Sequence, residues 1–131
     1  MSSPVLVSEE CLEALHHVKE KREVNTAVLR LAGGALVPEA VANWTHEELI
    51  QCLPLTEPRL VVHELAFATP GGARRNEPLL IFWMPSDAVG QEVDYTAAYT
   101  ALRELLTDVH VHLTARRPDQ LAYRRLVALA G

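Results

Sequence analysis

The chain has 131 residues, of which 49% are apolar and 22% charged, so its composition is that of a folded globular protein and its length suits one hydrophobic core. Its 17 acidic and 12 basic residues give a net charge of −5, and a field of that sign repels nucleic-acid phosphates and anionic lipid. We therefore expect a single domain over residues 1–131 that binds no nucleic acid.

The first expected element is a helix that begins after Ser8, because this serine suits an N-cap and Glu9 and Glu10 follow it in the first turn. The next apolar positions keep the helical period and form one face: Cys11, Leu12, Leu15 and Val18. Three cations stand at the negative end of the helix dipole: Lys19, Lys21 and Arg22. The outer face of this helix is therefore expected to be charged.

Apolar alternation with a period of two begins at Val24 and continues to Leu31, just before the pair Gly33-Gly34. This pattern predicts a strand that enters a hairpin, with the return strand opening at Leu36. A capping box over residues 45–48 then predicts a short helix that ends at Pro54.

Two long β-rich runs follow, over residues 59–67 and 78–84. The second run is apolar almost without alternation, which is typical of a strand that is covered on both faces. The segment between the runs contains Arg74 and Arg75 and is predicted to be a basic turn. We therefore expect two adjacent central strands with helices on both sides of the sheet.

The longest amphipathic helix is expected over residues ~92–106, followed by a strand at 109–113 and a helix that begins at Pro118. The expected element order is α-β-β-α-β-β-α-β-α. This order predicts an α/β fold of the α+β type, in which a central mixed β-sheet of five to six strands is sandwiched by helices on both faces.

Motifs for catalysis or cofactor binding are missing from the sequence. His110 and His112 would share one face of the last strand, but two ligands do not complete a zinc site. No Gly-x-Ser-x-Gly motif occurs, and neither glycine pair is followed by the Lys-Ser/Thr of a phosphate-binding loop. We expect no enzymatic activity and no cofactor; the alternative is a small enzyme that uses His110 and His112, which metal analysis would reveal.

Cys11 and Cys52 lie in predicted helices and lack the spacing of a disulfide framework, so we expect two buried free thiols in a reducing compartment. The first ten residues lack the basic start of a signal peptide, and no apolar run approaches the ~20 residues of a membrane span. These features predict a cytoplasmic protein without a membrane span, which we expect to be a monomer.

The segment Leu80–Pro85, with the sequence LIFWMP, and Tyr95 in the long helix resemble the actin-depolymerising factor/cofilin homology (ADF-H) domain. Three further segments resemble the glia maturation factor branch of that superfamily: residues 22–27, 47–62 and 106–126. The resemblance spans nearly the whole chain and implies a cofilin-like fold.

The resemblance to glia maturation factors implies binding to the actin-related protein 2/3 complex, filament debranching and inhibition of nucleation. Actin-binding cofilins carry lysines around the corresponding tyrosine, whereas here Glu92 and Asp94 precede Tyr95, and Tyr99 takes the place of an internal lysine. Acidic residues would repel the acidic actin surface. The main prediction is therefore a regulator of branched networks in the actin cytoskeleton; the alternative is a cofilin-like or coactosin-like binder of actin monomers or filaments.

The resemblance places partner contacts on the long helix, the N-terminus and the loop at Arg116-Arg117. The candidate partner-binding residues are Ser2, Ser3, Lys19, Lys21, Arg22, Arg74, Arg75, Glu92, Asp94, Tyr99, Arg103, Arg116 and Arg117. The two serines resemble the family's phosphorylatable N-terminus and are candidate phosphorylation sites. A purely structural role stays open for six of these residues: the helix dipole would account for the first three cations, solvation for the turn arginines and core packing for Tyr99.

Overall fold

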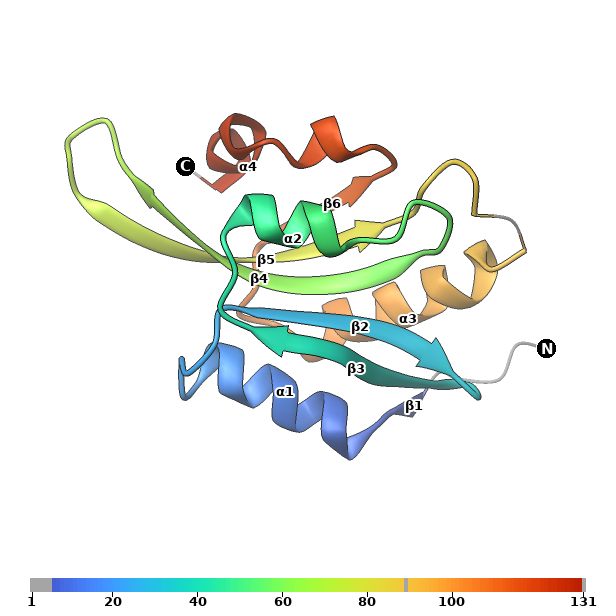
Figure 1. Ribbon diagram of the computed structural model, residues 1–131. Helices are drawn as coiled ribbons and strands as arrows, with labels where there is room; N and C mark the ends of the chain where they lie inside the picture. Colours follow the sequence, from blue (N-terminus) through green and yellow to red (C-terminus); the bar gives the residue numbers. More distant parts are fainter. Residues whose placement is uncertain (1–5, 89, 131) are drawn as a thin grey trace.

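A six-stranded mixed sheet with the order β1-β3-β2-β4-β5-β6 forms the middle layer of the molecule (Figure 1). The computed structural model describes residues 6–88 and 90–130. The strands are β1 (Leu6–Val7), β2 (Thr26–Ala32), β3 (Ala35–Ala42), β4 (Arg59–Ala68), β5 (Arg74–Trp83) and β6 (Val111–Ala115). The outer pairs β1–β3 and β5–β6 are parallel, and the pairs between them are antiparallel.

Helices cover both faces of this sheet, as the sequence predicts (Figure 1). They are α1 (Glu9–Lys19), α2 (His46–Cys52), α3 (Glu92–Leu105), the short 3-10 helix η1 (Pro118–Leu121) and α4 (Tyr123–Ala130). The side chains of α1 and α3 pack on one face against Leu60 and Val62, whereas α2, η1 and α4 pack on the other against Val61. Alternation along β4 therefore divides its side chains between two cores.

The helix caps that the sequence predicts for α1 and α2 form in the structure. The Ser8 side chain accepts a hydrogen bond from the Cys11 amide at 3.1 Å, and Thr45 and Glu48 form the reciprocal capping box of α2. Gly33 and Gly34 both have positive φ, +58° and +82°, which the two-residue turn between β2 and β3 requires.

Four expectations about the elements need correction. Strand β1 was not expected, and the last strand begins at Val111 instead of Val109 because the Val109 amide already donates to the Leu106 carbonyl. The β4–β5 turn is shorter than expected, so Arg74 and Arg75 lie on β5. The final helix is divided into η1 and α4 at Ala122, whose ψ of 142° is not helical.

The two cysteines have different surroundings. Cys11 is buried in the α1 core, and burial raises the pKa of its thiol to about 11. Cys52, at the end of α2, is exposed, so the expectation of two buried thiols is wrong for this residue. Leu49 and Leu53 take the core-facing positions at this end of α2, and Cys52 points to solvent.

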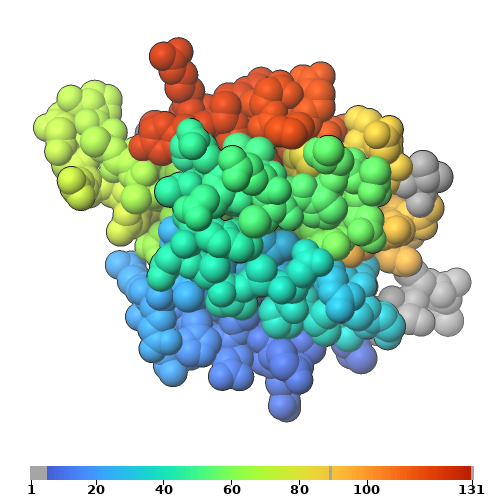
Figure 2. Space-filling model, in the orientation of Figure 1, coloured from blue at the N-terminus to red at the C-terminus, as the bar shows by residue number. Residues whose placement is uncertain are grey.

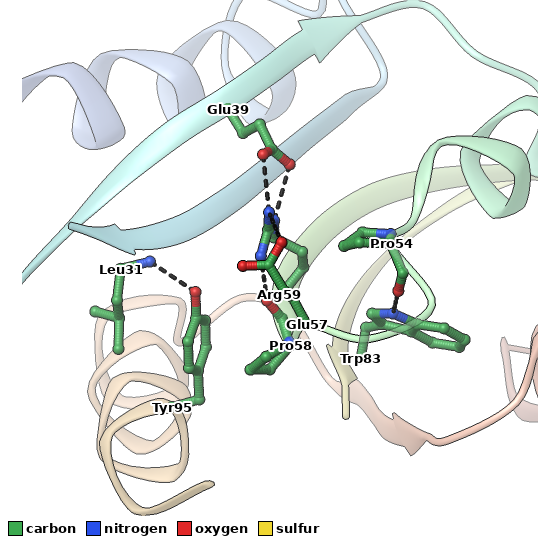
Figure 3. A network of polar contacts seen from close by, with 8 residues as sticks. All are labelled: Leu31, Glu39, Pro54, Glu57, Pro58, Arg59, Trp83 and Tyr95. Atoms are coloured by element: carbon green, nitrogen blue, oxygen red, sulfur yellow. Dashed lines mark hydrogen bonds and ion pairs between the residues drawn. The ribbon is translucent and has the colours of Figure 1, made fainter. Parts of the chain in front are cut away.

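A network of buried polar contacts joins the layers (Figure 3). The Arg59 guanidinium donates to both carboxylate oxygens of Glu39, at 2.8 and 3.0 Å, and to the Pro58 carbonyl at 2.7 Å. Glu39 is the extra residue of a β-bulge in β3: its neighbours Pro38 and Ala40 pair with Leu29 and Val28 of β2, and Glu39 has no partner there. Its side chain reaches across β2 to Arg59 of β4. The bond to Arg59 holds the pKa of Glu39 below its ordinary value.

Two further hydrogen bonds fix the ends of long elements (Figure 3). The Tyr95 hydroxyl on α3 accepts from the Leu31 amide of β2 at 3.0 Å, and the Trp83 indole at the end of β5 donates to the Pro54 carbonyl at 2.7 Å. Tyr95 therefore sets where α3 lies on the sheet, and one face of this helix must point away from the core.

Candidate functional site

The outward face of α3 is the first part of the candidate site. Tyr95, Ala98 and Leu102 are buried, and this leaves the opposite face of the helix in solvent. The exposed surface of α3 carries two apolar side chains: Val93, 75% exposed, lies opposite the buried residues, and Leu105, 46% exposed, lies on the flank two turns after Ala98. A long helix with apolar residues in water is suited to contact a partner protein.

Tyr99 lies on the flank of α3 between the core and the surface. Its ring packs on Phe82 with centroids 5.1 Å apart, and the Arg103 guanidinium lies 5.7 Å from the ring centroid on the same helix. Burial raises the pKa of the Tyr99 hydroxyl, and the charge of Arg103 opposes that rise. Tyr99 is thus half core residue and half surface residue.

The start of α3 meets the end of β6 at an acidic and basic corner. Glu92 and Asp94 are exposed, and a Glu92 carboxylate oxygen lies 3.4 Å from the Arg116 guanidinium. Arg117 pairs with Asp119 at 3.1 Å, and the Gln120 side-chain oxygen accepts from the amides of both arginines. The structure therefore brings together residues of α3 and of the Arg116-Arg117 loop, and their role in partner binding stays a prediction.

The cations after α1 lie at the other end of α3. Lys19 pairs with Asp108 in the turn that follows α3, and this contact holds the pKa of Asp108 below its ordinary value. Lys21 and Arg22 lie beyond the last turn of α1 and are exposed, and Arg22 has a positive φ of 54°. These three residues form a group separate from the Glu92–Arg116 corner.

Arg74 and Arg75 form a third group, on the β4–β5 hairpin that projects beyond the rest of the sheet (Figures 1 and 2). The Arg75 guanidinium lies 5.9 Å from the Phe67 ring centroid and 3.4 Å from Glu77. The hairpin extends away from the side of the molecule where α3 begins (Figure 1). Ser2 and Ser3 lie outside the described residues.

Nearby carboxylates neutralise several of the basic residues among the candidate partner-binding residues. Among the described residues, four candidate cations have a carboxylate partner: Lys19, Arg75, Arg116 and Arg117. The exposed α4 residues Arg124 and Arg125 add positive charge on the opposite side of the sheet from α3. The α3 face is therefore a mixed surface of apolar and paired charged groups.

No group of three His, Cys, Asp or Glu side chains that could hold a metal ion occurs within residues 6–88 and 90–130. His110 precedes β6, so the expectation that it shares a strand face with His112 is wrong. The Nε2 atom of His112 is buried without a hydrogen bond, and burial lowers the pKa of this histidine. Within the same residues, no helix combines the length and the apolar character that crossing a membrane demands.

A family model described as cofilin/tropomyosin-type actin-binding protein matches the sequence over residues 4–129. The chain belongs to this family. It is 25% identical over 125 residues to actin-depolymerizing factor 7 of Arabidopsis thaliana, with 93% of this chain and 91% of the relative covered. It is 28% identical over 120 residues to a cofilin of Cryptococcus neoformans, with 88% of this chain and 87% of the relative covered.

The fold is that of solved cofilins. The crystal structure of Streptomyces griseoflavus cofilin matches with a TM-score of 0.85 at 20% identity, over 95% of this chain and 98% of the other. This match confirms the expected ADF-H fold, and the family model over residues 4–129 confirms the superfamily. The relatives are named cofilins and actin-depolymerizing factors, so the narrower assignment to the glia maturation factor branch stays a prediction.

Sequence reasoning missed two features of the site. Val93, the most exposed apolar residue of α3, was not among the candidates, although its place in the first turn between Glu92 and Asp94 marks an outward position. The ion pair of Arg59 was also missed, because the sequence of β4 does not show that Glu39, at the bulge in β3, will pair with this arginine.

Proposed function

We propose that this protein binds actin, as a cofilin-like regulator in the cytoplasm that works by binding and carries out no chemical step. The exposed face of α3 carries the proposal, because the helix keeps Val93 and Leu105 in solvent while Tyr95 fixes it to the sheet. The family match over residues 4–129 supports actin as the partner. A rigid helix with apolar anchors can contact a partner without large ordering costs.

Reversal of one charge on this face tests the proposal. Arg103→Glu keeps α3 intact and places a second carboxylate beside Glu104, and we expect at least a roughly fivefold loss of affinity for monomeric actin. Arg124→Glu on α4 makes the same charge change on the other side of the sheet and should leave that affinity unchanged. Equal affinities for the two variants, measured with fluorescent monomeric actin, would refute the α3 face.

A second candidate function follows from the acidic first turn of α3. Glu92 and Asp94 stand where the resembling actin-binding cofilins have lysines, and Glu92 also neutralises Arg116. This observation favours the actin-related protein 2/3 complex as the partner, with debranching of filaments and inhibition of nucleation as the outcome. The finer function is that of the glia maturation factor branch.

The variant Glu92→Lys/Asp94→Lys separates the two candidates. If actin is the partner, the variant should bind actin several-fold more tightly than the original protein, because repulsion becomes attraction. If the actin-related protein 2/3 complex is the partner, the original protein should co-sediment with the complex and release branches under the microscope, and the variant should lose both. Glu47→Lys, exposed on α2 on the other side of the sheet from α3, is the control.

A further inference from the structure

A pocket lies on the other side of the sheet from α1 and α3, where the start of α2 and Tyr123 of α4 meet β4. Its volume is about 430 Å³. Its walls include the aromatic residues Trp44, His46 and Tyr123, and the His46 and Tyr123 rings lie 5.0 Å apart between centroids, tilted by 36°. The Tyr123 hydroxyl donates to the Ala66 carbonyl at 3.2 Å, so this wall is fixed to β4.

The pocket also contains a buried histidine, His63 of β4, which is only 2% exposed. The Asn25 side chain fixes its tautomer through Thr26. The Asn25 amide nitrogen donates to the Trp44 carbonyl, and the Asn25 oxygen accepts from the Trp44 amide and from the Thr26 hydroxyl. Since the Thr26 hydroxyl has one proton and gives it to Asn25, the His63 Nδ1 atom, 2.7 Å away, must donate to Thr26.

The other ring nitrogen of His63 is therefore an acceptor with a free lone pair. No described residue hydrogen-bonds to Nε2, and among described residues only His112 has a buried side-chain nitrogen or oxygen without a partner. The Nε2 atom thus keeps contact with solvent, which reaches His63 through the pocket. Burial lowers the pKa of His63 to about 4, and His46 adds to this effect, so the ring is neutral at neutral pH.

The charged group of the pocket is acidic. Glu48 uses one carboxylate oxygen in the capping box of α2 and has a second oxygen for a ligand. The Glu64 side chain, next to His63 on β4, points to the opposite face of the sheet, where it lines a hollow with Lys19 and Arg22. No lysine or arginine is among the described residues that line the pocket. An acceptor, a carboxylate and aromatic faces together favour a planar cation that donates several hydrogen bonds.

We propose that this pocket binds the guanidinium group of an arginine side chain presented by a partner protein. The His63 Nε2 atom accepts one N–H at the buried end, Glu48 balances the charge, and the aromatic walls pack on the plane of the cation. The pocket shares no residue with the α3 face, so this site extends the proposed function and can fail or hold independently of it.

Titration with blocked amino acids, followed by NMR of the Trp44 indole and the His63 ring, tests the chemistry. N-acetyl-arginine methylamide should shift both sets of signals. The citrulline analogue has nearly the same shape without the charge and should bind about tenfold more weakly, since hydrogen bonds between charged groups are stronger than neutral ones. Equal shifts from citrulline, or from the lysine analogue, would overturn guanidinium recognition.

Variants of the acidic residues test the location. Glu48→Gln should weaken binding of the arginine analogue several-fold while keeping the capping box, which glutamine also forms. Two variants are matched controls and should bind as the original protein does: Glu47→Gln, because Glu47 is exposed on α2 and does not line the pocket, and Glu64→Gln, because the Glu64 side chain points to the opposite face of the sheet. Unchanged affinity of Glu48→Gln, with circular dichroism showing that it is folded, would refute the site.

A last titration tests the source of the guanidinium. Agmatine carries the same group on a free small molecule, with a second positive charge in place of the peptide backbone. A blocked arginine within a short glycine peptide should bind at least as tightly as agmatine if the site accepts a protein side chain. Tighter binding of agmatine would overturn the assignment to a partner protein.

Discussion

Two pairs of arginine and glutamate, Arg59–Glu39 and Arg116–Glu92, have the same chemistry but different surroundings. The Arg59 side chain is 8% exposed and meets both oxygens of Glu39, whereas the Arg116 and Glu92 side chains are 51% and 61% exposed and meet at one 3.4 Å contact. Leaving one charge unpaired costs much free energy at the buried Arg59 site and almost none at the exposed Arg116 site. Burial therefore makes one pair part of the fold and leaves the other available to a partner.

The largest expected effect comes from removal of Glu39. Glu39→Ala leaves the Arg59 guanidinium buried, with the more distant Glu57, 3.7 Å away, as its remaining carboxylate partner among the described residues. The free energy of unfolding should therefore fall by about 3 kcal/mol. Urea denaturation measures the change. Glu92→Ala is the matched control and should cost less than about 0.5 kcal/mol. Similar losses in the two variants would show that burial does not distinguish the pairs.

The next effect is a pH dependence from His63. Its pKa is lowered from the ordinary 6.5 to about 4, so the unfolded chain binds more protons between these values and stability is lost as the pH falls from 6.5 to 4. The loss from this group should reach about 2–3 kcal/mol. His63→Gln should flatten the curve in this window, whereas the exposed His16→Gln should not.

Two other kinds of group affect the same experiment. His112 also has a lowered pKa and costs stability as the pH falls below its ordinary value of 6.5, but it is present in every variant and cancels in the comparison. Glu39 and Asp108 have lowered pKa values, so their stabilisation is lost at lower pH, below the ordinary values of 4.5 and 3.8. A His63→Gln curve as steep as that of the original protein would contradict a neutral buried His63.

The smallest expected change in stability belongs to the exposed pair. Glu92→Gln frees Arg116 and should change the free energy of unfolding by less than about 0.5 kcal/mol. The same variant should bind monomeric actin about threefold more tightly, because one repulsive charge is gone from the α3 corner. Asp119→Gln, which frees Arg117 in the same way, is a control for that loop. A large loss of stability with no gain in affinity would assign Glu92 to the fold.

Most of the fold could be predicted because its signals are local. Ser8 and the Thr45 capping box mark helix starts, and the unbroken apolar run of β5 shows that both of its faces are covered. Strand β1 could not be predicted, because Leu6 and Val7 form a strand only through pairing with Ala35 and Leu36. The first residue of β6 could not be predicted either, because it depends on the hydrogen bond from the Val109 amide to the Leu106 carbonyl.

The candidate site was less predictable. The sequence indicated which residues carry charge, but the carboxylate that each cation meets depends on the packing of α3 against β6 and α1. The thirteen candidates therefore divide into the Glu92–Arg116 corner, Tyr99 and Arg103 on the flank of α3, a group at the end of α1, a projecting hairpin and two serines outside the described residues. The pocket around His63 had no signal at all, since its lining comes from segments more than 90 residues apart, Asn25 to Tyr123.

The bulge in β3 that places Glu39 near Arg59 also affects how this protein behaves in concentrated solution. In the described residues β1 covers β3 only at Ala35 and Leu36, so the rest of this outer strand has no neighbouring strand on one side. Pro38 removes an amide there, and the irregular backbone at the bulge interrupts the regular spacing that another strand would need. The same β-bulge that stabilises a single molecule thus disfavours pairing between the edge strands of two molecules.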